Sequence, residues 1–107
     1  MENTLDNGKQ IAIIAYLTII GTVIAILMNS ESKNTFASFH IRQSLGIFIS
    51  WFALGYFVSY FDNWGVSSGF YLFIFILWIY GFVGAIQGEQ KLVPIVGEFY
   101  QKLFKNL

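Results

Sequence analysis

The sequence predicts an all-α integral membrane protein with three transmembrane helices and a C-terminal amphipathic interfacial helix. Three stretches of 18 residues each contain no charged side chain, at residues 11–28, 44–61 and 69–86. With a rise of about 1.5 Å per residue, each would form a helix about 27 Å long, close to the thickness of the hydrocarbon core of a bilayer. Apolar residues make up 56% of the chain and charged residues only 11%. That charged share is well below the roughly 25% of soluble domains, so we expect residues 1–107 to form a single membrane domain.

The three spans have recognisable ends. The first is expected over residues 11–28 and stops at Asn29. The second is expected over residues 40–61, with good helix formers before its apolar part, and stops at Asp62. The third is expected over residues 69–88, after a short turn that contains one glycine and two serines. Spans two and three should therefore form a tight hairpin.

The chain closes with an amphipathic segment. Residues 94–106 are expected to form a helix, and Pro94 fits its first turn. On a helical wheel one half of this segment is apolar, and we expect that half to enter the membrane interface. The other possibility is that the tail folds back onto the helix bundle or onto a partner. The interfacial contacts are expected from Phe99, Tyr100, Leu103 and Phe104.

The basic residues predict an orientation. Three spans would put the loop before span two and the C-terminal tail on one side of the membrane, and the N-terminal arm on the other. Five basic residues then lie on the first side and only Lys9 on the second. The positive-inside rule predicts that the N-terminus is outside and the C-terminus is cytoplasmic, in the cytoplasmic (inner) membrane of a bacterium.

Small and polar residues form stripes along the spans. Lipid-facing helices can be apolar all round, so such a stripe marks a face that packs against another helix. Plain packing explains these stripes without any transport function. The expected packing residues are Ala15, Thr18, Thr22 and Ala25 of span one, and Gly81, Gly84 and Gly88 of span three.

One polar cluster lies at the predicted cytoplasmic end of span two. It consists of His40, Arg42, Gln43 and Ser44, and we take it as a candidate contact site for a partner or substrate. Two simpler explanations stay open. Arg42 can extend to lipid phosphates, and His40 can cap or pair with a loop carbonyl.

The composition excludes several kinds of chemistry. The chain has no cysteine and a single histidine, which makes a metal site improbable, and no span holds an Asp or Glu for ion coupling. We therefore expect no enzymatic activity, no cofactor and no metal. The net charge is zero and the basic residues are scattered, so no nucleic acid is expected. The expected partners are membrane lipids and other membrane proteins, or further copies of the chain.

The start of span two resembles a known family. Phe39, His40, Gln43, Ser44 and Leu45 match the Phe-His-x-x-Gln-(Ala/Ser)-Leu pattern of the small bacterial relatives of the chloroplast inner-envelope import component, the twenty-kilodalton Tic protein. Their functions are largely unknown. The similarity extends through the glycines of span three to the proline-containing tail.

This resemblance implies an import-component-like function. The protein would assist translocation or membrane insertion of polypeptides within a complex. An alternative is a structural accessory subunit that stabilises a larger membrane complex. A third possibility is a small homo-oligomeric channel, which would need a polar lumen lined by Thr18, Thr22, Ser44 and Ser59.

Overall fold

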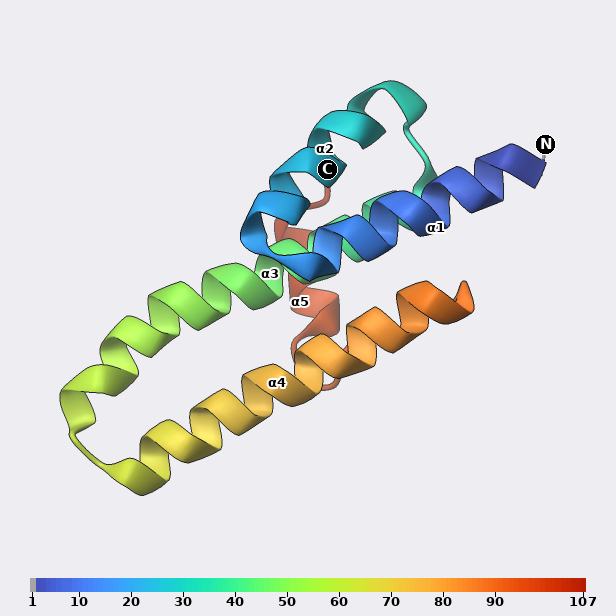
Figure 1. Cartoon of the computed structure of the whole chain (residues 1–107). Helices are drawn as coiled ribbons and strands as arrows, with labels where there is room; N and C mark the ends of the chain where they lie inside the picture. The colour runs from blue at the N-terminus through green and yellow to red at the C-terminus, as the bar shows by residue number, and fades with distance from the viewer. Residues whose placement is uncertain (1) are drawn as a thin grey trace.

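The computed structural model describes the backbone of residues 2–107 and the side chains of residues 7–107, and this part of the chain is helical without strands. Two long helices lie along the length of the molecule, and three shorter ones gather around one half of them (Figure 1). The molecule measures 52 × 22 × 22 Å. The helices are α1 (Glu2–Leu17), α2 (Ile19–Ser32), α3 (Thr35–Val58) with a short 3-10 extension η1 (Ser59–Phe61), α4 (Trp64–Gln87) and α5 (Gly97–Leu103).

The two long helices account for the second and third predicted spans. Within residues 2–107, they are the helices long and apolar enough to cross a membrane, over Thr35–Phe61 and Trp64–Gln87. Both start earlier than expected from the sequence. The predicted turn over residues 62–68 shrinks to two residues, because the Asn63 side chain accepts a hydrogen bond from the Val66 N–H at 3.1 Å and caps α4 there.

The prediction of one continuous helix over residues 11–28 is wrong. The first helix ends at Leu17, Thr18 is extended (φ −156°, ψ 175°), and a second helix starts at Ile19. These two helices, α1 and α2, pack on each other as a V-shaped hairpin (Figure 1). The apolar parts of the two arms, residues 11–17 and 19–28, span about 10 and about 15 Å, at most half the hydrocarbon thickness. Three transmembrane helices are therefore not confirmed.

Three backbone groups at the tip of this hairpin are bonded by side chains. Thr18 Oγ1 accepts a hydrogen bond from the Gly21 N–H at 3.1 Å, and Thr22 Oγ1 donates to the Ala15 carbonyl at 2.7 Å. The Trp78 indole Nε1 of α4 donates to the Tyr16 carbonyl at 2.6 Å. A side chain at Gly21 would collide with the Ile14 carbonyl oxygen, so the tight turn needs a glycine there. Because hydrocarbon offers no hydrogen-bond partners, these contacts are what allow a helix break among apolar residues.

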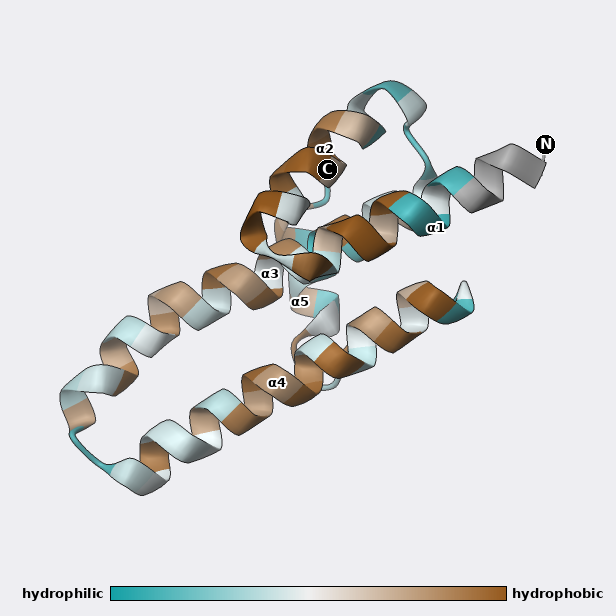
Figure 2. Ribbon diagram, viewed as in Figure 1, coloured by the Kyte–Doolittle hydropathy of each residue, from teal (hydrophilic) through white to brown (hydrophobic). Residues whose placement is uncertain are grey.

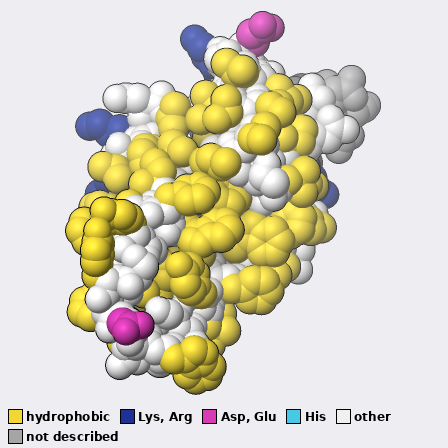
Figure 3. Space-filling view, turned by 60° about the vertical axis from the view of Figure 1, so that its left-hand side comes forward, with side chains coloured by type: hydrophobic (Ala, Val, Ile, Leu, Met, Phe, Trp, Pro, Cys, Tyr) yellow, Lys and Arg dark blue, Asp and Glu magenta, His cyan; other side chains and the backbone are white. Residues whose placement is uncertain are grey.

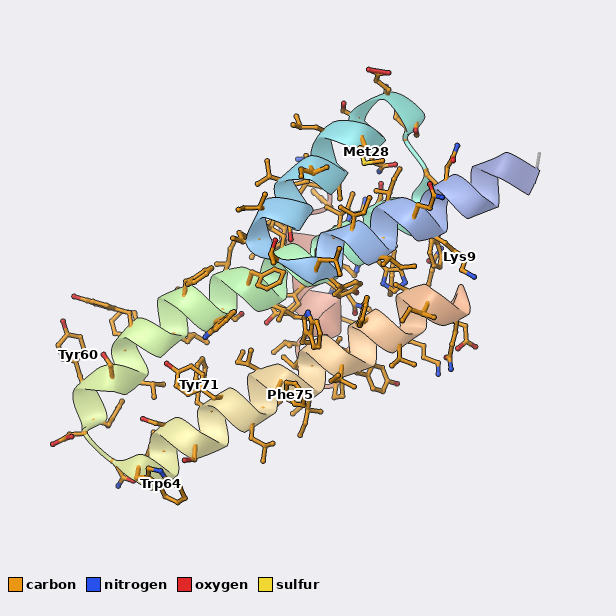
Figure 4. All side chains as sticks on the ribbon, viewed as in Figure 1. Lys9, Met28, Tyr60, Trp64, Tyr71 and Phe75 are labelled. Atoms are coloured by element: carbon orange, nitrogen blue, oxygen red, sulfur yellow. The ribbon has the colours of Figure 1, made fainter. Side chains whose placement is uncertain are left out.

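The hairpin returns the chain to the end where it began. A Cβ placed on Gly8 of α1 would lie 2.5 Å from Asn34 Oδ1, just before α3, and a Cβ on Gly88 would lie 3.8 Å from Cδ of Lys9. Figure 4 shows Lys9 beside the end of α4, far from Tyr60 and Trp64 at the other end of the molecule. The start of α1 and the end of α4 thus share one end, and the predicted placement of the N-terminal arm opposite the tail does not hold. The cause is the break at Thr18, which reverses the chain.

The C-terminal helix is shorter than the predicted 94–106. Ile95 has a positive φ of 70°, which interrupts the helical path, so α5 begins at Gly97. This helix lies against α3, and Val93 and Tyr100 are buried. Phe99 and Leu103 stay exposed. The tail therefore folds back onto the bundle, as the alternative reading of the sequence allowed, with one apolar edge left open.

Many large apolar side chains are exposed on the surface. In Figure 2 brown segments run along α2, α3 and α4, with paler segments between them, and deeper teal lies mainly in the loops and toward the end of the molecule that holds the N-terminus. The face in Figure 3 is largely hydrophobic, with charged side chains at its margins. Among the strongly exposed side chains are Ile20, Leu27, Phe52, Tyr56, Phe57, Tyr60, Phe61, Trp64 and Leu72. Such a surface suits lipid and not water.

Removing the hydroxyl of Thr22 should weaken the hairpin. Thr22→Val keeps the shape of the side chain but leaves the buried Ala15 carbonyl with no donor from residue 22. Loss of such a partner costs about 1–3 kcal/mol. We expect that decrease in the free energy of unfolding, measured by denaturant titration in detergent micelles. Thr22→Ser, which keeps the hydroxyl, is the matched control and should lose less than half as much; equal losses would contradict the assignment.

Candidate functional site

The polar centre of the molecule is built around His40. Its ring is fully buried in α3, with Nδ1 2.8 Å from the Tyr16 hydroxyl of α1 and Nε2 2.7 Å from the Glu89 carbonyl oxygen, just after α4. A carbonyl only accepts, so Nε2 carries the proton facing Glu89. This contact resembles the loop-carbonyl pairing that the sequence left open as the simpler explanation for His40.

Gln43 extends the same network into the tail. Its Nε2 donates to the Tyr16 hydroxyl at 3.0 Å, and its Oε1 accepts from the Val93 N–H at 2.7 Å. The Tyr16 hydroxyl therefore accepts from Gln43 and donates to His40 Nδ1. When His40 is neutral, each group donates to the next: the Val93 N–H to Gln43, Gln43 to Tyr16, Tyr16 to His40, and His40 to the Glu89 carbonyl. We call these four side-chain and backbone links the Tyr16–His40–Gln43 network.

Apolar groups close around this network. The rings of Phe36 and Phe39 meet the His40 ring edge to face, with centroids 4.8 and 5.0 Å away. Gly81 and Gly84 of α4 provide the space on the other side. A Cβ on Gly81 would lie 2.8 Å from Tyr16, and one on Gly84 would lie 3.6 Å from His40 Cε1. The network is thus enclosed in a low-dielectric environment, where satisfied hydrogen bonds are strong.

Arg42 faces away from this network, toward the tail. Its Nη2 donates to the Lys105 carbonyl at 3.0 Å, and its Nη1 donates to Gln101 Oε1 at 3.3 Å. The Gln101 amide in turn donates to the Phe39 carbonyl at 2.8 Å. Arg42 therefore ties the end of α5 to the start of α3, and lipid phosphate is not needed to explain its position.

A tyrosine anchors the tail more deeply. The Tyr100 ring lies over Gly46, where any side chain would collide with it, and its hydroxyl is 2.6 Å from Ser50 Oγ. Burial raises the pKa of the Tyr100 phenol, although the hydrogen bond to Ser50 acts in the opposite direction. Ser50 is ten residues beyond His40, so the tail reaches about 15 Å along α3.

Only two of the four predicted contact residues act together. His40 and Gln43 share one network, whereas Arg42 bonds to the tail and Ser44 Oγ donates to the Ile41 carbonyl of its own helix at 3.1 Å. The sequence analysis missed Tyr16. A signal was present, because Tyr16 is the only aromatic residue in the apolar stretch 11–28.

The predicted packing residues lie mainly at helix contacts. Ala15, Thr22 and Ala25 are fully buried, and Gly81 and Gly84 are buried against the network. Thr18 is exposed and caps α2 instead. Gly88 has a φ of 75° and ends α4 as a left-handed cap. Of the predicted interfacial residues, Tyr100 is buried, Phe104 is half-buried, and Phe99 and Leu103 are exposed.

The contacts made by this cluster join parts of the chain to one another. Residues 7–107 contain no cluster of three or more His, Cys, Asp or Glu side chains that could hold a metal ion. His40 has a hydroxyl and a carbonyl as partners, and both of its nitrogens are occupied by them. What the network does is join α1, α3, the end of α4 and the tail through hydrogen bonds.

Two archaeal proteins are similar to this chain along most of its length. The UPF0132 membrane protein MJ1527 of Methanocaldococcus jannaschii is 28% identical over 104 residues, which cover 95% of this chain and 73% of that protein. The UPF0132 membrane protein MJ1443 of the same organism is 27% identical over 99 residues, which cover 92% and 88%. No family model matches the chain, and no solved structure matches it. With its two long apolar helices, the chain is an all-helical membrane protein.

The network should act as one unit. Tyr16→Phe and Gln43→Leu each remove hydrogen bonds with little change in volume, and each should lower the free energy of unfolding by about 1–3 kcal/mol. Both substitutions disrupt the same chain of hydrogen bonds. The double variant should therefore lose less free energy of unfolding than the two single variants together, with a coupling energy of about 0.5–3 kcal/mol. A double-mutant cycle in detergent micelles measures it. The exposed Ser59→Ala serves as control, and strict additivity of the two changes would contradict the network.

Proposed function

We propose that this protein is a non-catalytic structural subunit of a larger membrane complex. The observation that carries the proposal is that His40, Gln43 and Tyr16 satisfy one another inside the molecule. The surfaces left for a partner within the membrane are therefore apolar helix faces. Association there depends on close van der Waals packing and not on polar recognition.

The exposed side of α4 is the face we expect to bind a partner. Leu72, Ile76, Ile79 and Val83 follow one another at spacings of three and four residues, and all four are substantially exposed. Such spacing puts side chains on one stripe of a helix. We call this stripe the α4 outer face. It is uncharged over its whole length and therefore suits a transmembrane segment of another protein.

An import-type function is the second candidate, and the match at residues 39–45 supports it. In the structure, however, Phe39, His40 and Gln43 hold the hairpin and the tail on α3. Because these residues hold the fold together, their match to the import-component pattern supports a common fold more directly than a common activity. A channel has less support, because Thr22 and Ser44 bond to backbone carbonyls within the chain.

We further propose that α3 and α4 cross the membrane and that both termini are cytoplasmic. The α1–α2 hairpin would then enter and leave the membrane on the cytoplasmic side. Residues 62–63 would form the outer loop, and Asp62 is the only charged residue between Arg42 and Glu89. All six basic residues then lie on one side, which strengthens the charge bias over the three-span arrangement. We expect the membrane to be the cytoplasmic one.

Cysteine labelling tests this topology, and the chain has no cysteine of its own. We expect Asn7→Cys and Asn106→Cys to be protected from a membrane-impermeant maleimide in intact cells, and Asn63→Cys to react. All three should react after permeabilisation, which controls for accessibility. Labelling of Asn7→Cys together with Asn63→Cys would instead support three spans and contradict the proposal.

Purification in mild detergent tests the subunit function. We expect a membrane complex to copurify in fixed stoichiometry, and its yield to fall in cells that lack this protein. Alanine at Leu72, Ile76 and Ile79 together should release the partner, whereas alanine at Ile49, exposed on α3, should not. Mass spectrometry identifies what is released. Recovery of translocation machinery with defective insertion of new membrane proteins would favour the import-type function instead, and recovery of the chain alone would contradict both.

A further inference from the structure

The molecule is wider in one half of its length than in the other. Within residues 2–107, the half that ends at the loop of residues 62–63, here called the outer half, consists of α3 and α4 alone, and the other half also holds α1, α2 and α5 (Figure 1). Burial follows this division. The buried residues of α3 lie between Phe36 and Phe48, with Gly55 as the exception, and those of α4 lie between Ile74 and Ala85.

The tip of the α1–α2 hairpin marks the depth at which the width changes. The tip is fixed to α4 by the hydrogen bond from the Trp78 indole to the Tyr16 carbonyl. At about 1.5 Å per residue, Trp78 lies about 21 Å from the Trp64 end of α4 and about 14 Å from the Gln87 end. The hydrocarbon core of a bilayer is about 30 Å thick. In the proposed topology the hairpin therefore occupies the cytoplasmic leaflet alone.

The two arms of the hairpin diverge from this tip (Figure 1). At the tip they touch, since Gly21 of α2 packs against the Ile14 carbonyl of α1. Toward their other ends a pocket of about 400 Å³ separates them, lined by Asn7, Gln10, Ile11, Leu27, Met28, Glu31 and Ser32. The width of the protein thus increases again from the middle of the bilayer toward the cytoplasmic surface.

We propose that this protein acts as a wedge that favours curved membrane in which the cytoplasmic leaflet is convex. A helix with its side chains is about 10 Å wide and so occupies about 80 Å² of the membrane plane. Two helices in the outer leaflet then take about 160 Å², and four in the cytoplasmic leaflet take about 320 Å². A molecule of this shape fits best where the leaflet around its wide half is the more expanded one. The proposal rests on the proposed topology and goes beyond the subunit function.

The contacts of Tyr16 keep the wedge in shape. Its carbonyl accepts from Trp78, and its hydroxyl lies between His40 and Gln43, so the hairpin is bonded to both long helices and cannot fold away from them freely. A transmembrane helix of a partner on the α4 outer face would add the same area to both leaflets. The difference between the leaflets would therefore remain within a complex.

Reconstitution into vesicles of different diameter tests the proposal. The probes are phosphatidylcholine vesicles that contain the single-cysteine variants Asn7→Cys, Asn63→Cys or Asn106→Cys. Protein per lipid is measured by fluorescence on single vesicles, and the exposed side is identified with a membrane-impermeant maleimide. We expect several-fold more protein per lipid in the smallest vesicles. Their convex leaflet faces outward, so Asn7→Cys and Asn106→Cys should react there and Asn63→Cys should be protected.

Side-chain bulk added to the two halves should change this preference in opposite directions. Ile20→Trp with Leu27→Trp enlarges the hairpin, and Leu54→Trp with Leu72→Trp enlarges the outer half. All four side chains are exposed, so the replacements leave the packed interior intact. We expect the first pair to steepen the dependence of protein density on vesicle diameter and the matched second pair to flatten it.

The outcomes separate the wedge from the topology beneath it. If Asn7→Cys and Asn106→Cys react from one side but protein density does not depend on diameter, the wedge is wrong and the topology stands. Shifts in the same direction in both tryptophan variants, no shift in either, or Asn63→Cys at the convex surface would also overturn the wedge. Reaction of Asn7→Cys and Asn106→Cys from opposite sides would reject the topology and the wedge together.

Discussion

A backbone that leaves the helix inside hydrocarbon must find every hydrogen-bond partner within the protein, and the chain leaves the helix at Thr18. Three of the groups freed there, the Gly21 N–H and the carbonyls of Ala15 and Tyr16, are bonded by Thr18, Thr22 and Trp78. The last of these comes from α4, so the break can exist only where α4 is already packed beside α1. The helix break and the tertiary structure therefore depend on each other.

Tyr16 connects this constraint to the rest of the molecule. Its carbonyl receives the Trp78 indole, and its hydroxyl lies between His40 and Gln43. One residue next to the break thus holds α1 to both long helices, and Gln43 carries the connection into the tail through Val93. The polar side chains that stand out in the sequence are used to position two short elements on a two-helix scaffold.

The sequence predicted what depends on composition and spacing along the chain. The helices α3 and α4 follow from two long uncharged stretches, and the buried positions of Ala15, Thr22, Ala25, Gly81 and Gly84 follow from stripes of small and polar residues. The break at Thr18 could not be read in the same way. Threonine is tolerated within a helix, and its use as a cap depends on Gly21 and on the approach of the Ile14 carbonyl, which only the folded chain shows. His40 pairs with Glu89, just after α4 and 49 residues away, and Arg42 pairs with Lys105 in the tail, 63 residues away, so no local pattern identifies these partners.

The loop that joins α3 to α4 has a consequence for how the chain enters a membrane. It consists of residues 62 and 63 alone, because η1 continues α3 as far as Phe61 and α4 begins at Trp64. In the proposed topology, where α3 and α4 cross the membrane as a closed pair, Asp62 is the one charged side chain between Arg42 and Glu89 that must pass through the bilayer. The charge-transfer cost of inserting such a pair is then set by the single carboxylate of Asp62.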